Sequence, residues 1–90
     1  MRIQLIKFGT LLSGRPAGKE AYLSARAYLL PQDKNELVEI DFTGVQVLSP
    51  SWADEFITPL KNALGKNLIL LPSANSSVKA SLEMLAEQHQ

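Results

Sequence analysis

The sequence contains no cysteine, a single histidine and no excess of charge of either sign. Without cysteine, the chain has no disulfide, no thiol nucleophile and no thiolate ligand for a metal. Nine basic and nine acidic residues give a formal net charge of zero. A nucleic-acid binder or a polybasic membrane-surface protein needs an excess of positive charge. We therefore expect neither nucleic acid nor membrane among the partners of this protein.

The residues needed for catalysis are also scarce. His89 is the penultimate residue, where chains fray, so it is a poor general base. A serine nucleophile needs a positioned base, and the sequence offers no cluster with the spacing of a metal site. The segment from Gly14 to Glu20 resembles a phosphate-binding loop, but Pro16 removes an N–H from the cradle and Glu20 replaces the required hydroxyl. We therefore expect no catalytic residues, no metal, no cofactor and no enzyme activity.

Long apolar runs are missing as well. A membrane-spanning helix takes about 20 apolar residues, whereas the apolar run in the C-terminal half is the four-residue stretch Leu68–Leu71. The first eight residues lack the apolar stretch of a signal peptide. We therefore expect a cytoplasmic protein. Because 90 residues suffice for one small domain, we expect a single domain over residues 1–90.

Apolar periodicity and turn residues predict strands that alternate with helices. Strands are expected at residues 2–8, Leu11–Leu12, Glu36–Asp41 and from Lys66 or Asn67 to Leu71. Helices are expected from Ala17 to Leu30, where Pro31 ends the helix, from Ser49–Ser51 to about Leu64, and from Ser76–Ser77 to before Gln88. Pro59 predicts a kink in the second helix or an earlier end near Thr58. This order predicts an α/β fold with a small, mostly parallel (mixed) sheet of about four strands and helices packed against it.

The segment from Val38 to Phe56 carries the most information. A buried strand ends in Asp41, at the edge where small α/β sheets usually place their sites. A short connection through Gly44, with buried Val and Leu anchors, then leads into the second helix. This helix start is therefore the first place to look for function.

Two helix caps fit the residues at this start. Ser49 is one, with Pro50 at the first helical position. Ser51 is the other, with Asp54 closing an imperfect capping box three residues later. We place Asp54 and Glu55 in the first turn, where the helix dipole favours negative charge. Adjacent helical residues point about 100° apart, so these two carboxylates are not expected to share a proton as an acid–base pair.

The same segment resembles the STAS domains, the sulfate-transporter and anti-sigma-antagonist superfamily, and more closely the STAS-like family of unknown function. The resemblance rests on a strand ending in Asp-Phe, a Gly-Val pair, and Ser-x-Ser followed by an aromatic residue, Ala, Asp and Glu. These residues are Asp41-Phe42, Gly44-Val45, Ser49-Pro50-Ser51 and Trp52-Ala53-Asp54-Glu55. With Phe8-Gly9 and Arg15, the resemblance covers roughly residues 3–62.

The resemblance implies a regulatory protein-interaction domain related to anti-sigma factor antagonists. Those proteins carry a serine at this helix start. A partner kinase, which is also the anti-sigma factor, phosphorylates this serine, and the added charge abolishes binding to that kinase. The spacing from Asp41 carries that serine onto Ser51, and Ser49 is the second phosphorylation candidate. The implied partner is a histidine-kinase-like ATPase or an anti-sigma factor. The partner-binding residues predicted here are Asp41, Ser49, Ser51, Trp52, Asp54 and Glu55.

Two other functions stay open beside this one. The domain is an oligomerising or structural unit, such as a homodimer, if the serines act only as helix caps. It is a small-ligand binder if a polar pocket forms that the sequence does not reveal. A phosphate adds about −1.5 to −2 charge at pH 7, which suits a charge switch in a neutral chain. We also expect Trp52 to be partly buried with its indole edge near the surface, and Arg15 to pair with Asp41 or Asp54.

Overall fold

The computed structural model describes residues 1–30 and 35–88, so the expected helix end at Pro31 and the terminal His89 lie outside the described residues. The strands are β1 (Arg2–Gln4), β2 (Leu11–Leu12), β3 (Val38–Asp41), β4 (Val47–Leu48) and β5 (Leu68–Leu70). The α-helices are α1 (Arg15–Tyr28), α2 (Pro50–Leu64) and α3 (Ser76–Gln88), and the 3-10 helices are η1 (Leu5–Phe8) and η2 (Gly65–Asn67). The α/β class predicted from the sequence is therefore confirmed.

The strands form two separate parallel sheets in the part of the chain that is described. One sheet has three strands in the order β1-β3-β5, and the other pairs β2 with β4. The predicted parallel pairing is confirmed, whereas the prediction of about four strands in one sheet is wrong. The strand expected over residues 2–8 ends at Gln4, because the chain turns into η1 and then passes Gly9 at φ 126°. A second turn at Gly44, with φ 88°, directs β4 away from β3 toward β2.

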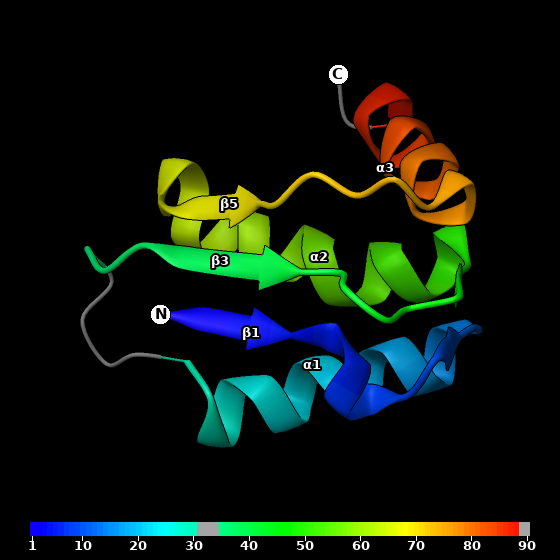
Figure 1. Cartoon of the computed structure of the whole chain (residues 1–90). Coiled ribbons are helices and arrows are strands. Elements are labelled where there is room, and N and C mark those ends of the chain that lie inside the picture. Colours follow the sequence, from blue (N-terminus) through cyan, green and yellow to red (C-terminus); the bar gives the residue numbers. More distant parts are fainter. Residues whose placement is uncertain (31–34, 89–90) are drawn as a thin grey trace.

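The helices are arranged around the three-stranded sheet as in Figure 1. α1 and α2 lie side by side on one face of the sheet, and both begin near the carboxyl ends of the strands. α3 packs against α2 and β4. The carboxyl edge of the sheet and the N-terminal ends of α1 and α2 thus lie at the same end of the molecule.

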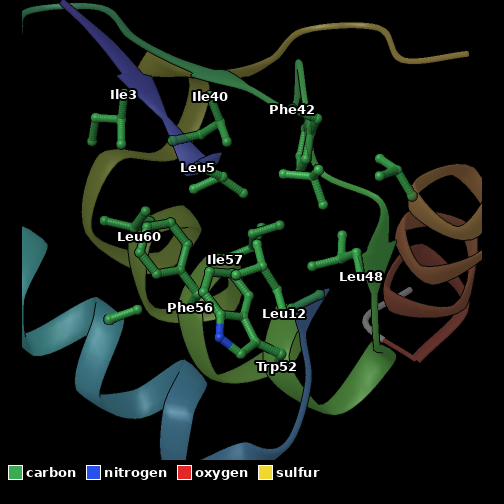
Figure 2. Packing of buried hydrophobic residues seen from close by; sticks show 14 of the residues in the cluster. Ile3, Leu5, Leu12, Ile40, Phe42, Leu48, Trp52, Phe56, Ile57 and Leu60 are labelled. Atoms are coloured by element: carbon green, nitrogen blue, oxygen red, sulfur yellow. The ribbon is translucent and has the colours of Figure 1, made fainter. Parts of the chain in front are cut away.

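The core lies between the sheet and the apolar stripe of α2. This stripe follows helical spacing and is buried at Trp52, Ala53, Phe56, Ile57 and Leu60. Figure 2 shows these α2 side chains facing those of β1, η1 and β3. The rings of Trp52 and Phe56 are stacked with their centroids 5.0 Å apart, and Phe8 packs edge-on against Phe56 at 5.5 Å. The aromatic residues therefore anchor the first two turns of α2 in the core.

Small residues bring α1 close to α2. The buried residues of α1 are Gly18, Ala21 and Ala25. A Cβ atom at Gly18 would lie 2.6 Å from the backbone oxygen of Trp52. Only glycine permits the two backbones to approach this closely. The close contact fixes the start of α2 against the start of α1.

The predicted bounds of two helices need correction. α1 begins at Arg15 rather than Ala17, because Gly14 provides the non-helical conformation (φ 87°) that precedes its first turn, and it ends at Tyr28 rather than Leu30. The predicted end of α2 near Thr58 is wrong, since the helix continues through Pro59 to Leu64. Proline removes one helical hydrogen bond, but buried residues on both sides of Pro59 hold the helix against the core. Among the described residues, no helix is long and apolar enough to cross a membrane.

Candidate functional site

Ser49 is the cap of α2, and it also joins α2 to α1. Its Oγ accepts a hydrogen bond from the N–H of Trp52 at 3.2 Å and another from the N–H of Gly14 at 3.2 Å. Its own N–H donates to the carbonyl of Leu12 at 2.8 Å. One serine therefore accepts from an amide at the start of each helix and connects both helices to β2. Of the two caps considered from the sequence, the structure has the one at Ser49.

Ser51 has a different position from the one that a cap would have. It is the second residue of α2, it is half-buried, and its Oγ lies 3.2 Å from the Oγ of Ser49. The alternative in which Ser51 caps the helix and Asp54 closes a capping box is therefore wrong. Since the helix begins at Pro50, Asp54 and Glu55 lie beyond its first turn, which carries no acidic residue, contrary to our expectation.

Arg15 joins the start of α1 to the acidic pair of α2. Its Nη1 donates to Asp54 Oδ2 at 2.9 Å and lies 3.5 Å from Glu55 Oε1. The hydrogen bond to Asp54 and the two nearby carboxylates raise the pKa of Arg15 above its ordinary value. The expected pairing of Arg15 with Asp54 is confirmed, whereas Asp41 pairs elsewhere. We call Ser49, Ser51, Arg15, Asp54 and Glu55 the serine site.

Asp41 is buried at the carboxyl end of β3, where it stabilises the following turn. Its Oδ1 accepts hydrogen bonds from Thr43 Oγ1 at 2.7 Å and from the Thr43 N–H at 2.9 Å. These two bonds lower the pKa of Asp41 below its ordinary value. The geometry accounts for Asp41 as a turn-forming residue whose Oδ1 accepts from both the backbone and the side chain of Thr43.

Trp52 is almost completely buried, with 1% of its surface exposed. The expectation of a partly buried ring with an edge at the surface is therefore wrong. The ring is covered because Gly18 lets α1 approach the backbone of Trp52, while Phe8 and Phe56 pack against the indole. Trp52 belongs to the predicted partner-binding set, but in this structure it supports the serine site from within the core.

Two exposed apolar residues beside the serine site were missed by the sequence reasoning. Leu11 on β2 and Val47 on β4 are register partners, and their side chains are 65% and 43% exposed. Their neighbours Leu12 and Leu48 are buried, as the alternation of a strand requires. Both residues of each short strand are apolar, so the sequence did not show which of them is exposed, and only the pairing of β2 with β4 brings the two exposed residues together.

The start of α3 holds β4 in place through a group of polar side chains. Asn75 Nδ2 donates to the carbonyls of Val45 and Gln46, while its Oδ1 accepts from the Val78 N–H and caps α3. Ser77 and Ser81 both donate to the carbonyl of Leu48. These contacts come from residues 29 to 33 positions away in the sequence, so periodicity gave no signal for them.

The serine site and the apolar pair beside it present groups of several kinds. They offer hydroxyls at a helix start, one guanidinium, two carboxylates and an adjacent apolar pair. Within the ranges 1–30 and 35–88, no group of three or more potential metal ligands comes together. A partner surface that contacts this region would meet charge, hydroxyl and apolar groups within a short stretch of chain.

The comparisons with known proteins identify one family. Residues 26–79, more than half of the chain, match the family model described as a STAS-like domain of unknown function (DUF4325). The matched range contains the strand ending in Asp41, the two serines and all of α2. No curated protein and no solved structure shows a significant match to the chain.

Proposed function

The chain belongs to the family of STAS-like domains of unknown function, and from this we propose that it is a regulatory protein-interaction domain. The proposed docking surface consists of the exposed pair Leu11 and Val47 together with the serine site. The observation that carries the proposal is the position of this apolar pair, which is exposed on the β2–β4 ribbon that leads directly into the start of α2.

The apolar pair supports docking because a protein interface needs an apolar centre with a polar rim. Leu11 is 65% exposed and pairs with Val47 on the neighbouring strand. The rim is supplied by Arg15, Asp54 and Glu55, whose side chains are 56%, 23% and 34% exposed. Such a surface favours a protein partner over a small ligand, because it combines an exposed apolar pair with a charged rim, as protein interfaces do.

Ser51 is the residue that we propose to control this docking by phosphorylation. Ser49 is less suitable, since its Oγ already accepts two backbone N–H groups and its modification would break the α2 cap. Ser51 is half-buried, and in the part of the chain that the structure describes its Oγ has a hydrogen bond with the Oγ of Ser49 alone. A kinase would therefore need to rearrange little more than the first turn to reach Ser51.

The charges around Ser51 explain how a phosphate would act. The serine site holds one cation, Arg15, and two carboxylates, Asp54 and Glu55, so its side chains sum to −1. A phosphate of about −1.5 to −2 would bring that sum to about −2.5 to −3. Asp54 and Glu55 follow Ser51 by three and four residues on the same helix and so lie on its face. The modified surface would repel a partner that had bound the neutral serine.

The proposed partner is a histidine-kinase-like ATPase or an anti-sigma factor, and it follows from the resemblance to anti-sigma factor antagonists. It requires neither a cofactor nor a catalytic residue in this chain, and we propose no enzyme activity. We further propose a cytoplasmic location, where such partners occur. A homodimer through the same surface is the competing outcome of the test below.

The test measures partner binding by the wild type, by Ser51→Asp and by Leu11→Asp. The wild-type domain is used as bait to capture its partner from the native host. The captured kinase or anti-sigma factor is then purified, and its affinity for each variant is measured by calorimetry. We expect both variants to lose binding at least about tenfold, a loss of about 1.4 kcal/mol. Met84→Asp is the matched control, because Met84 is 45% exposed on α3 and outside the proposed surface.

Two outcomes would contradict the proposal. Equal binding by Ser51→Asp and the wild type would remove the phosphorylation control. A stable homodimer in light scattering, lost in Leu11→Asp but kept in Met84→Asp, would instead assign the surface to self-association.

A further inference from the structure

A second surface lies at the opposite end of α2 and is independent of the serine site. A groove of about 740 Å³ opens between the C-terminal half of α2, η2, β5 and α3. Its apolar wall is formed by Ile57, Leu68, Leu70, Leu82 and Leu85. Leu70 is 37% exposed although β5 belongs to the central sheet. The apolar core residues are therefore continuous with an exposed groove, and no helix or strand among the described residues covers this groove.

The groove runs beside an open edge of the three-stranded sheet. β5 is the last strand in the order β1-β3-β5, and among residues 1–30 and 35–88 no further strand lies beside it in Figure 1. The N–H of Leu71 donates to the carbonyl of Ile40 on β3 at 3.0 Å. In a parallel ladder, alternate residues direct their N–H and C=O groups toward the same neighbour. Leu70 therefore directs its own N–H and C=O away from β3, toward the open edge.

An open edge of this kind is a template for an additional strand. Unpaired N–H and C=O groups accept the backbone of an extended segment, and pockets for alternate side chains give such binding its specificity. Here the backbone groups of Leu70 and the apolar groove lie next to each other. The combination fits an extended peptide better than a compact ligand, because a compact ligand would leave the strand edge unused.

The charge of the groove indicates which kind of segment it accepts. The charged side chains among the described residues that line it are two exposed lysines, Lys61 in the last turn of α2 and Lys66 in η2. η2 directly precedes β5, so both lysines lie toward the amino end of that strand. If two copies of this chain paired through β5, four lysines would be brought into one interface, which like-charge repulsion opposes. An acidic partner is favoured instead.

We propose that β5 and this groove bind an extended acidic and apolar segment of a partner protein as an added strand. The backbone of the segment pairs with Leu70. Its groove-facing side chains are apolar beside Leu70 and acidic near Lys61 and Lys66. The surface is distinct from the proposed docking surface, so a partner engages it whether Ser51 is modified or not.

The test uses a heptapeptide of sequence Glu-Thr-Val-Thr-Val-Thr-Glu as the probe. Its alternate residues place Val in the groove and Glu at either end, so it fits in both strand directions. The isotope-labelled full chain is titrated and the amide resonances are followed by NMR. We expect saturable shifts at Leu70 and Leu85. A peptide with Lys in place of both Glu should bind at least about tenfold more weakly.

Three variants separate the contributions. Lys61→Glu combined with Lys66→Glu should reverse the preference between the two peptides, whereas Lys19→Glu combined with Lys79→Glu, at exposed positions outside the groove, should not. Leu70→Pro should abolish binding, because it removes the outward N–H, and proline is tolerated on an edge strand at that position. Its spectrum without peptide reports whether the chain stays folded.

Several results would overturn the proposal. One is the absence of saturable shifts with the Glu-ended peptide. Another is equal affinity for both peptides, or a charge preference that the two groove lysines do not control. A third is a stable homodimer through β5 that excludes the peptide.

Discussion

At its N-terminal end α2 is tied to α1, to β2 and to the core, whereas at its C-terminal end it stops beside an open groove. The first end has a buried tryptophan, a cap shared by two helices and an ion pair across them. The second end has Gly65, two exposed lysines and a half-exposed strand edge. The polar side chains at the first end bond mainly to one another beside an exposed apolar pair, whereas the second end leaves a groove and a strand edge open.

The largest effect is expected from a comparison of Trp52→Ala with Leu70→Ala, one substitution at each end of α2. Trp52 is 1% exposed and stacked on Phe56, so its truncation should lower the free energy of unfolding by about 3–5 kcal/mol. Leu70 is 37% exposed, so its truncation should cost about 1 kcal/mol or less. Urea denaturation followed by circular dichroism measures both. Equal losses would show that the groove end is as tightly packed as the other.

The next test adds one methyl group beside each end of α2 by a Gly→Ala substitution. Gly18→Ala should destabilise by about 1–3 kcal/mol, because the new Cβ would meet the Trp52 backbone. Helix propensity alone predicts a gain of about 0.5–1 kcal/mol, which is the opposite sign.

Gly65→Ala finds open space, but its backbone has φ 55° and ψ −127°, so strain should cost about 1–3 kcal/mol. Only Gly18→Ala should alter the fluorescence of Trp52. An unchanged spectrum in that variant would mean that the two helices separate without disturbing the indole.

A smaller effect distinguishes the two serines. Ser49→Ala should cost about 0.5–2 kcal/mol, because it removes the cap and leaves the N–H groups of Gly14 and Trp52 without their acceptor. Ser51→Ala should change stability by no more than about 0.5 kcal/mol. Thermal unfolding of the two variants at one pH makes the comparison. If Ser51→Ala proved the more damaging, Ser51 would have a structural role that its hydrogen bonds do not indicate.

The smallest effect depends on pH. Hydrogen bonds from Thr43 lower the pKa of Asp41 in the folded chain, while the unfolded chain has the ordinary Asp value of about 3.9. The stabilisation by ionised Asp41 is therefore fully present above about pH 4 and is lost as the pH falls through the lower folded value.

Asp41→Asn should remove this part of the pH dependence of the free energy of unfolding, while the packing of the groove end around Leu70 stays unchanged. Urea unfolding at pH 7 and pH 3 measures it. The same pH dependence in Asp41→Asn and the wild type would assign the effect to other carboxylates.

Much of the local structure was predictable because the signals are local. The start of α2 follows from Ser49 and Pro50, the apolar stripe of that helix from its spacing, and the family from the run between Asp41 and Glu55. The division into two sheets was not predictable, since it depends on where η1 and the turn at Gly44 direct the next strand.

The burial of Trp52 was mispredicted for a similar reason. The indole is covered because a glycine on a different helix allows close approach, and that glycine lies 34 residues away in the sequence (52 − 18 = 34). The exposed pair Leu11 and Val47 and the groove beside β5 also depend on contacts between distant segments. Sequence periodicity describes one element at a time, so it does not report what an element is packed against.

The amino-acid sequence by itself determined the α/β class and the family and limited the cap of α2 to Ser49 or Ser51, because hydrophobic spacing, capping chemistry and motif residues act within a few positions of each other. Only the tertiary structure decided which of these residues a partner is able to reach. It placed Trp52 in the core and Leu11 at the surface, and it left the edge of β5 open beside two lysines. The physical reason is that exposure and charge complementarity are properties of packed neighbours, and the neighbours here come from opposite parts of the chain.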